Sequence, residues 1–171
     1  MKIKFLLAAL LLSTATLFAA MPKAGDPAPA FSGENQAGKT VSLADFSGKK
    51  TVLLYFYPKD FTGGCTKEAC GFRDRMGDLQ TNNVEVIGVS FDTAASHLEF
   101  IKQYHLNFTL LADTDGKIAE AYDVKMPIMK MAKRVSFLIG TDGKIIHVTN
   151  AGDPAKHFDE MKAAIDGLKK N

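Results

Sequence analysis

Residues 51–70 read Thr51-Val-Leu-Leu-Tyr-Phe-Tyr-Pro-Lys-Asp-Phe-Thr-Gly-Gly-Cys-Thr-Lys-Glu-Ala-Cys70, and this stretch holds both cysteines of the 171-residue chain. Its first seven residues are strand formers, Pro58 ends the strand, and Gly63-Gly64 predicts a bent loop. Cys65 then falls where a helix should begin. A thiol at a helix N-terminus is the usual setting of a reactive thiolate, because the helix dipole and the free N–H groups stabilise the anion. The stretch therefore predicts a strand–loop–helix unit with a redox-active thiol.

The spacing of the two cysteines argues against a structural disulfide. On one intact helix, a five-residue step separates the two Cα atoms by roughly 8.6 Å, whereas a relaxed disulfide needs less than about 7 Å. A bond that distorts its own helix is a poor staple and is typical of a catalytic disulfide. If the electrophile is a peroxide, Cys65 becomes a sulfenic acid, and Cys70 condenses with it to a disulfide with loss of water. Two thiols without a second pair or nearby histidines also fall short of a four-ligand metal site.

The first twenty residues have the layout of a secretory signal peptide. Lys2 and Lys4 form a short basic region, and an apolar region follows at 5–12. The apolar region is too short to favour a transmembrane helix. We therefore predict a signal peptide at 1–20, export to the bacterial periplasm, and a domain at 21–171. The alternative is a protein anchored in the membrane by an uncleaved N-terminal segment.

The charge of the remaining chain is balanced. Removing residues 1–20 takes away two lysines and no acid, so the 21 basic residues become 19, against 19 acidic residues. No basic run and no interleaving of basic with aromatic residues suggests a nucleic acid partner. About 150 residues is the size of one domain, and it is enough to bury a core without disulfide staples.

Hydrophobic periodicity predicts alternating strands and helices. Near-continuous apolar runs at 51–57 and 84–91, with a helix between them, imply a central βαβ unit. The turn signal Thr141-Asp-Gly-Lys144 joins two later strands and adds antiparallel pairing. The predicted elements are a β-hairpin between Phe31 and Leu43, strands at 51–57, 84–91, 108–111, 134–139 and 145–149, and helices at 65–79, 94–104, 117–122 and 155–168. This order predicts one compact α/β domain.

Three of the predicted helices have an apolar face. Positions three and four residues apart lie on the same side of a helix, so they indicate which side chains point into the core. The predicted inward residues are Ala69, Phe72, Met76 and Leu79 in the first helix, Leu98, Ile101 and Tyr104 in the second, and Phe158, Met161, Ile165 and Leu168 in the last.

Several motifs of the chain resemble one enzyme family. Pro58-x-x-x-Thr62-x-x-Cys65 resembles the active-site motif of the peroxiredoxins. The longer run from Leu54 to Asp60, with Gly64-Cys-Thr-Lys-Glu-Ala-Cys-Gly-Phe-Arg-Asp74, resembles the bacterioferritin comigratory protein branch, also called PrxQ. In that branch a resolving cysteine commonly lies five residues after the peroxidatic one. The resemblance extends over nearly all of the chain after residue 20, because Gly25-Asp-Pro-Ala-Pro-Ala-Phe31, Ile87-Gly-Val-Ser90 and Arg134-Val-Ser-Phe-Leu-Ile139 resemble further family segments in the same order.

The resemblance implies a thioredoxin-like α/β fold with an N-terminal β-hairpin extension and a central mixed sheet flanked by helices. It implies a thiol-dependent peroxidase that reduces hydrogen peroxide and organic hydroperoxides. No metal, haem or flavin cofactor is needed, because the two thiols hold both electrons. A thioredoxin-like dithiol protein would be the reductant, and the protein would be a monomer.

The resemblance also assigns roles to individual residues. The two cysteines match the peroxidatic and the resolving residue, and an arginine would hold the thiolate and polarise the peroxide as charge develops on the leaving oxygen. The matching residues are Cys65 as peroxidatic cysteine, Cys70 as resolving cysteine, Thr62 as hydrogen-bonding hydroxyl, Pro58 as shield, Arg134 as the active-site arginine, and Glu68 as the residue that orients Arg134.

Gly63 departs from the resemblance most clearly, because the branch usually has proline there, and this predicts a more mobile loop. Val135 and Gly140 also replace residues that are more typical of the family.

Without the family resemblance, the residues leave two other functions open. An exported thiol–disulfide oxidoreductase is the alternative enzyme, although a C-x-x-C motif is missing. A binding module with a structural disulfide is the non-enzymatic alternative.

The histidines and a methionine cluster suggest no cofactor site. His97, His105, His147 and His157 have no spacing that indicates a shared ligand site, so we expect surface residues or residues satisfied within their helix or strand. Met126, Met129 and Met131 could bind copper in an exported protein. Such residues more often cover an apolar face near a substrate entrance or a reductant's docking surface.

Overall fold

The computed structural model describes residues 20–168, and the predicted signal peptide lies almost wholly outside them. One seven-stranded sheet has the order β2-β1-β5-β4-β3-β6-β7. The elements are β1 (Ser32–Asn35), β2 (Thr40–Ser42), the 3-10 helix η1 (Leu43–Phe46), β3 (Thr51–Phe56), α1 (Gly63–Asp74), α2 (Met76–Thr81), β4 (Val84–Ser90), α3 (Ala94–Tyr104), β5 (Thr109–Ala112), α4 (Lys117–Ala121), β6 (Val135–Ile139), β7 (Ile145–Thr149) and α5 (Pro154–Leu168).

The sheet is mixed, as the sequence predicts. Strands β3, β4 and β5 pair in parallel, and β6 and β7 continue the sheet in antiparallel pairing on the other side of β3. The hairpin of β1 and β2 extends the far edge, where β1 pairs antiparallel with β5. Strand β3 therefore lies inside the sheet, between β4 and β6.

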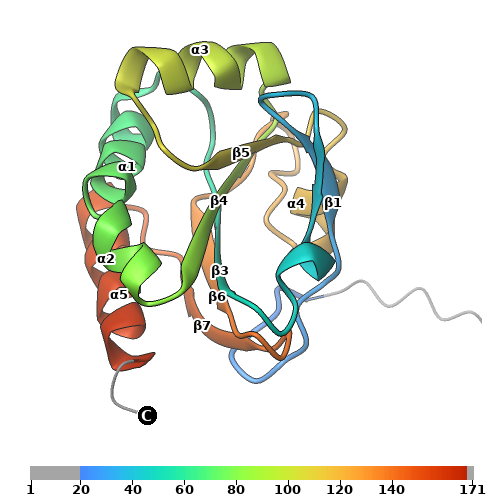
Figure 1. The fold of residues 1–171 in the computed structure, drawn as a ribbon. Helices are drawn as coiled ribbons and strands as arrows, with labels where there is room; N and C mark the ends of the chain where they lie inside the picture. Colours follow the sequence, from blue (N-terminus) through green and yellow to red (C-terminus); the bar gives the residue numbers. More distant parts are fainter. Residues whose placement is uncertain (1–19, 169–171) are drawn as a thin grey trace, which may run out of the picture.

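Helices cover both faces of the sheet (Figure 1). One core contains side chains of α1, α2, α3 and α5, and the other contains side chains of α4 and the N-terminal segment. All six residues of β3 are buried. Leu53 and Tyr55 point into the first core, and Val52, Leu54 and Phe56 point into the second. Burial on both faces explains why this strand is a continuous apolar run.

The predicted helix at 65–79 is wrong as a single element. It begins two residues earlier, at Gly63, and it breaks at Arg75 into α1 and α2. Gly77 and Asp78 follow the break and have weak helix propensity, so little is lost when the helix changes direction there. The predicted apolar face survives the break, because Ala69, Phe72, Met76 and Leu79 are all buried.

The predicted inward faces of α3 and α5 are confirmed except at Leu98, because the other predicted residues are buried or pack against the first core, but the prediction lacked one histidine in each helix. His97 and Phe100 are the buried residues of α3, whereas Leu98 is 38% exposed. In α5 the buried residues are His157, Met161 and Ile165, and Phe158 packs at the margin of the core. Each helix is oriented so that one histidine points into the core, where a polar group of the sheet contacts it.

Among residues 20–168, no helix has the length and apolarity that a membrane span requires.

Candidate active site

Cys65 lies in the first turn of α1, directly after the loop that leaves β3. Its side chain is 2% exposed and belongs to the same core cluster as Tyr55 and Ala69. Cys70 lies on the same helix and is partly buried, and both thiols are free. The helix is continuous between them, so the geometry agrees with the argument that a disulfide cannot form until this segment unwinds.

Arg134 approaches Cys65 from the neighbouring strand. It precedes β6, which pairs antiparallel with β3, so the end of β3 and the start of β6 lie side by side. Its Nη2 donates to the sulfur of Cys65 at 3.3 Å, and its Nη1 donates to Oε2 of Glu68. The guanidinium side chain is only 11% exposed. A fixed positive charge at this place stabilises a thiolate on Cys65.

Glu68 lies one helical turn after Cys65, and no part of its side chain is exposed. Burial raises the pKa of Glu68 to about 7, although Arg134 acts in the opposite direction. Its second oxygen, Oε1, has no hydrogen-bond partner and lies 3.5 Å from Nε2 of His157 on α5. Burial lowers the pKa of His157 to about 4, so this imidazole is neutral at pH 7.

Thr62 and Pro58 flank the thiol within the loop. Thr62 is the N-cap residue of α1 and is exposed, and its hydroxyl donates to the carbonyl of Lys59 at 3.1 Å. In this arrangement the hydroxyl is used within the loop, so its predicted contact with the sulfur or the peroxide stays a prediction. Pro58 is partly buried and lies two residues after the end of β3, and its shielding role stays a prediction.

A buried polar cluster anchors this loop to α3. Asp60 is 2% exposed and accepts hydrogen bonds from the hydroxyls of Tyr57 and Ser96, both at 2.7 Å. Nδ1 of His97 lies 2.9 Å from the same carboxylate, and its Nε2 lies 3.1 Å from the carbonyl of Leu111. Burial by itself raises the pKa of Asp60, but the interactions with His97, Ser96 and Tyr57 outweigh burial and lower it.

We expect Asp60→Asn to lower the free energy of unfolding at pH 7 by about 3 kcal/mol, because the buried carboxylate accepts hydrogen bonds from Tyr57 and Ser96, and its loss weakens this buried cluster. The folded-state pKa of Asp60 lies below its ordinary value, so its contribution is present above that value and is lost as pH falls through the lowered pKa. The difference between wild type and variant should therefore shrink below about pH 4. Urea unfolding at pH 7 and pH 3.5 measures it, with Asp123→Asn as the exposed control. Equal stability of D60N and wild type at pH 7 would show that the cluster does not hold the loop.

Sequence reasoning missed Asp60, His97, Ser136 and His157 as parts of this region. A signal for the two histidines was present. His97 lies three residues before Phe100, and His157 lies four residues before Met161, so each shares a helical face with a core residue. A histidine in such a position is buried and needs polar partners, which points to a polar cluster inside the core.

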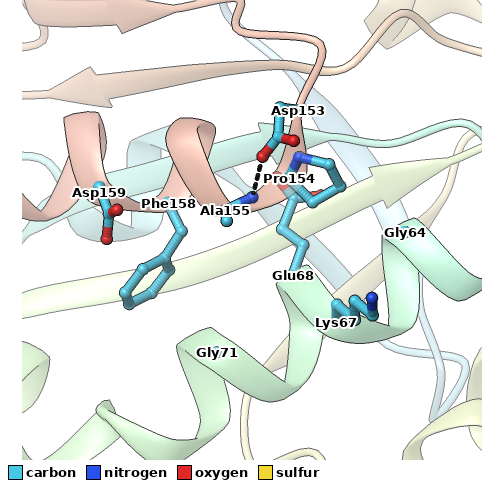
Figure 2. Close-up of a pocket in the computed structure, with 9 residues that line it drawn as sticks. All are labelled: Gly64, Lys67, Glu68, Gly71, Asp153, Pro154, Ala155, Phe158 and Asp159. Carbon is cyan, nitrogen blue, oxygen red and sulfur yellow. Dashed lines mark hydrogen bonds between the residues drawn. The ribbon is translucent and has the colours of Figure 1, made fainter.

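A pocket of about 390 Å³ lies between α1 and α5, and Glu68 is one of its lining residues. Figure 2 shows its lining side chains, with Phe158 of α5 lying opposite Gly71 of α1. A methyl group on Gly64 would lie 3.3 Å from Nη2 of Arg134, so Gly64 adjoins both the pocket and the guanidinium. The lining residues are Gly64, Lys67, Glu68, Gly71, Asp153, Pro154, Ala155, Phe158 and Asp159. Its volume is in the range of small-molecule sites.

The fold and this site define a thiol-based oxidoreductase, in which a buried thiol at a helix N-terminus faces an arginine. A family model described as the AhpC/TSA family matches residues 24–148. Peroxiredoxin Bcp of Escherichia coli K12 is 45% identical over 143 residues, which are 80% of this chain and 91% of that protein. The chain belongs to the AhpC/TSA family and, within it, to the peroxiredoxins of the Bcp/PrxQ branch.

Further relatives agree with this assignment. The chloroplastic peroxiredoxin Q of Triticum aestivum is 41% identical over 84% of this chain and 67% of its own length. Peroxidoxin BcpB of Mycobacterium tuberculosis superposes with a TM-score of 0.80 at 30% identity, over 85% of this chain and 97% of that one. The Xanthomonas campestris bacterioferritin comigratory protein, described for its alkyl peroxide reduction activity, gives a TM-score of 0.75 at 26% identity, over 80% and 90%. These matches confirm the predicted family, thioredoxin-like fold and thiol-dependent peroxidase class.

Proposed function

We propose that the protein reduces hydrogen peroxide and organic hydroperoxides with Cys65 as the nucleophile. The observation that carries this proposal is the contact between Cys65 and Arg134, with 3.3 Å between Sγ and Nη2. The thiolate attacks one peroxide oxygen, the O–O bond breaks, and the other oxygen leaves with a proton as water or an alcohol. Cys65 is then a sulfenic acid. The charge of Arg134 stabilises the thiolate before the reaction and the leaving oxygen during it.

Cys70 completes the cycle by resolving the sulfenic acid. Its thiol attacks the oxidised sulfur of Cys65, a disulfide forms, and water leaves. Because both residues lie on the continuous helix α1, the first turns of this helix must unwind for the sulfurs to meet. Gly63, the first residue of α1, stands in place of the usual proline, and an added Cβ there would meet no atom within 4 Å, so a side chain at this position has room to move when the helix unwinds.

Organic hydroperoxides fit the pocket between α1 and α5. Its walls combine the apolar side chains of Phe158, Pro154 and Ala155 with the ammonium of Lys67. The peroxide end of a substrate at Arg134 would leave its carbon chain in this space. The described activity of the Xanthomonas relative towards alkyl peroxides supports the same substrate class for this protein.

The test of this function is consumption of peroxide by the reduced protein with an added dithiol. A protein that reduces disulfides in insulin but does not consume peroxide would instead be a thiol–disulfide oxidoreductase. A disulfide that survives mild reductant and forms independently of peroxide would support a structural role.

We expect Cys70→Ser to separate the two steps. Cys65 should react with peroxide at a rate within about twofold of wild type, because Cys70 takes no part in the attack. Turnover with a dithiol protein should fall by on the order of a hundredfold, because the resolving thiol is no longer held near the sulfenic acid. Trapping of the sulfenic acid by dimedone, read by mass spectrometry, measures the first step. A small monothiol should restore turnover in part, and full turnover with the dithiol protein alone would remove the resolving role.

A thioredoxin-like dithiol protein is the reductant that this chemistry favours. If the protein is exported, this reductant must be present in the same compartment. The motivation for export is the basic and apolar pattern of residues 1–20. We expect the mature N-terminus near Ala20 in the periplasmic fraction, as measured by mass spectrometry. An intact N-terminus in the membrane fraction would support the anchored alternative. Failure of every exported thioredoxin-like protein to reduce the Cys65–Cys70 disulfide would count against this partner.

A monomer is expected and is tested by light scattering.

A further inference from the structure

The orientation of His157 is determined by two hydrogen bonds at opposite sides of its ring. Nδ1 lies 3.1 Å from the carbonyl of Ala151, which only accepts, so Nδ1 carries the hydrogen of the neutral ring. Nε2 lies 2.7 Å from the hydroxyl of Ser136 in β6, which can donate to this nitrogen or rotate and leave its lone pair to another donor. The imidazole is fully buried. Its Nε2 therefore presents a lone pair to the space beside Ser136, and the same space contains Oε1 of Glu68.

Glu68 and His157 then face each other as two acceptors. Oε1 of Glu68 is buried, has no hydrogen-bond partner, and lies 3.5 Å from Nε2. An ionised carboxylate opposite a lone pair is unfavourable in a buried site, because neither group can replace the water that it lost. One proton between the two atoms removes this conflict. On Oε1 it makes a carboxylic acid that donates to Nε2, and on Nε2 it makes an imidazolium paired with the carboxylate.

We propose that His157 is a positioning residue for peroxide reduction: it shares one proton with Glu68, and this proton leaves the charge of Arg134 available to Cys65. The inference rests on the peroxidase function proposed above. Without the proton, Glu68 neutralises Arg134, and the group of Arg134, Glu68 and His157 carries no net charge. With the proton, the same group carries one positive charge, which balances a thiolate on Cys65.

The other charged groups around the pair do not supply this proton. Those that face it are Cys65 from α1, Arg134 before β6, Tyr55 from β3 and Glu160 from α5. Burial raises the pKa of Tyr55 far above neutrality, so it stays neutral. Glu160 accepts a hydrogen bond from the hydroxyl of Thr149, which directs it to β7.

The shared proton predicts a pH profile for the oxidation of Cys65. The rate should fall near pH 7, as the pair loses its proton. His157→Asn keeps an amide that can reach Ala151 but lacks an atom at the Nε2 position. The falling limb of H157N should therefore move to lower pH by about one unit, the effect of one hydrogen bond, with about a fivefold lower rate at pH 7. His157→Gln restores an acceptor near Nε2 and should move the limb back towards wild type.

Rate profiles of wild type, H157N and H157Q from pH 5 to 9 test the role, with His105→Asn as the exposed control. Oxidised Cys65 is measured by rapid quench and mass spectrometry. H157N with the profile of wild type would overturn the positioning role, and so would a profile in H157Q that matches H157N. Ser136→Ala should shift the falling limb of the pH–rate profile while the imidazole stays in place. This variant therefore tests the positioning role if H157N does not fold.

Imidazole ¹⁵N NMR tests the shared proton without any activity. The Nε2 resonance of His157 should change as pH passes about 7 in wild type and stay constant in Glu68→Gln, whose amide always donates to it. An Nε2 resonance that behaves alike in both proteins would overturn the inference. A shared proton in a protein that consumes no peroxide would support the pair and contradict the peroxidase function, so the two failures are distinguishable.

Discussion

Replacing Cys65 by serine lowers the rate of peroxide reduction by at least about three orders of magnitude, the scale on which loss of a nucleophile acts in covalent catalysis. A serine hydroxyl stays protonated near neutral pH, and the charge of Arg134 is too weak to ionise it. Oxygen also forms no stable analogue of the sulfenic acid. Both steps of the cycle are therefore lost together.

The Cys65→Ser variant should keep the fold. The side chain is 2% exposed, and serine is slightly smaller, so it fits the same space in the first core. The measurement is consumption of hydrogen peroxide with excess dithiol, together with a thermal unfolding curve. The matched control is Cys70→Ser, which should still be oxidised once per chain. Normal turnover of C65S would show that another group is the nucleophile.

Replacing Arg134 by methionine should lower the rate constant of Cys65 oxidation by on the order of 10² to 10³, the range for loss of one electrostatic donor. The guanidinium contacts the sulfur with Nη2 and Glu68 with Nη1 at the same time. Methionine has a similar length but no charge and no donor. Glu68 then lies buried without its cation, which raises its pKa further and keeps it protonated.

Arg134→Lys should recover little of this loss. A lysine keeps the charge, but its single ammonium group lacks the planar fork that reaches two acceptors in different directions. The chain contains no tryptophan, so rapid quench with mass spectrometry replaces the usual fluorescence signal. Arg73→Met is the control, because Arg73 pairs with Asp74 at the far end of α1. If R134K reacts as fast as wild type, charge alone is sufficient and the two-pronged geometry has no role.

The predicted strand and the helix that begins near Cys65 are present in the structure, and the reason is local. Tyr57 and Pro58 mark the end of the strand by residue type. The predicted loop at Gly63-Gly64 is wrong, because both glycines belong to the first turn of α1. The apolar face of the following helix is visible as a repeat of three and four residues. These signals depend on neighbours along the chain, so one sequence contains them in full.

The faces of α3 and α5 were harder to predict because histidine is ambiguous. Periodicity counts Leu98 and Phe158 as core residues, since they are apolar. The structure instead brings His97 and His157 fully inside, where Asp60, Ser136 and Glu68 meet them. Burying a polar side chain is unfavourable unless other groups form hydrogen bonds with it. For these two histidines, such groups belong to other elements of the fold.

Local patterns in the chain were thus enough to predict the α/β class and the order of its elements and to propose which thiols react, because periodicity, turn residues and spacing involve neighbouring positions. Tertiary structure alone decided which polar groups meet. Arg134 is 69 positions from Cys65 and 66 from Glu68, and it reaches both only because β6 pairs with β3. His157 reaches Glu68 only because α5 packs on α1. The partner of a buried charge is chosen by strand pairing and helix packing between distant segments, and no spacing within one segment specifies it.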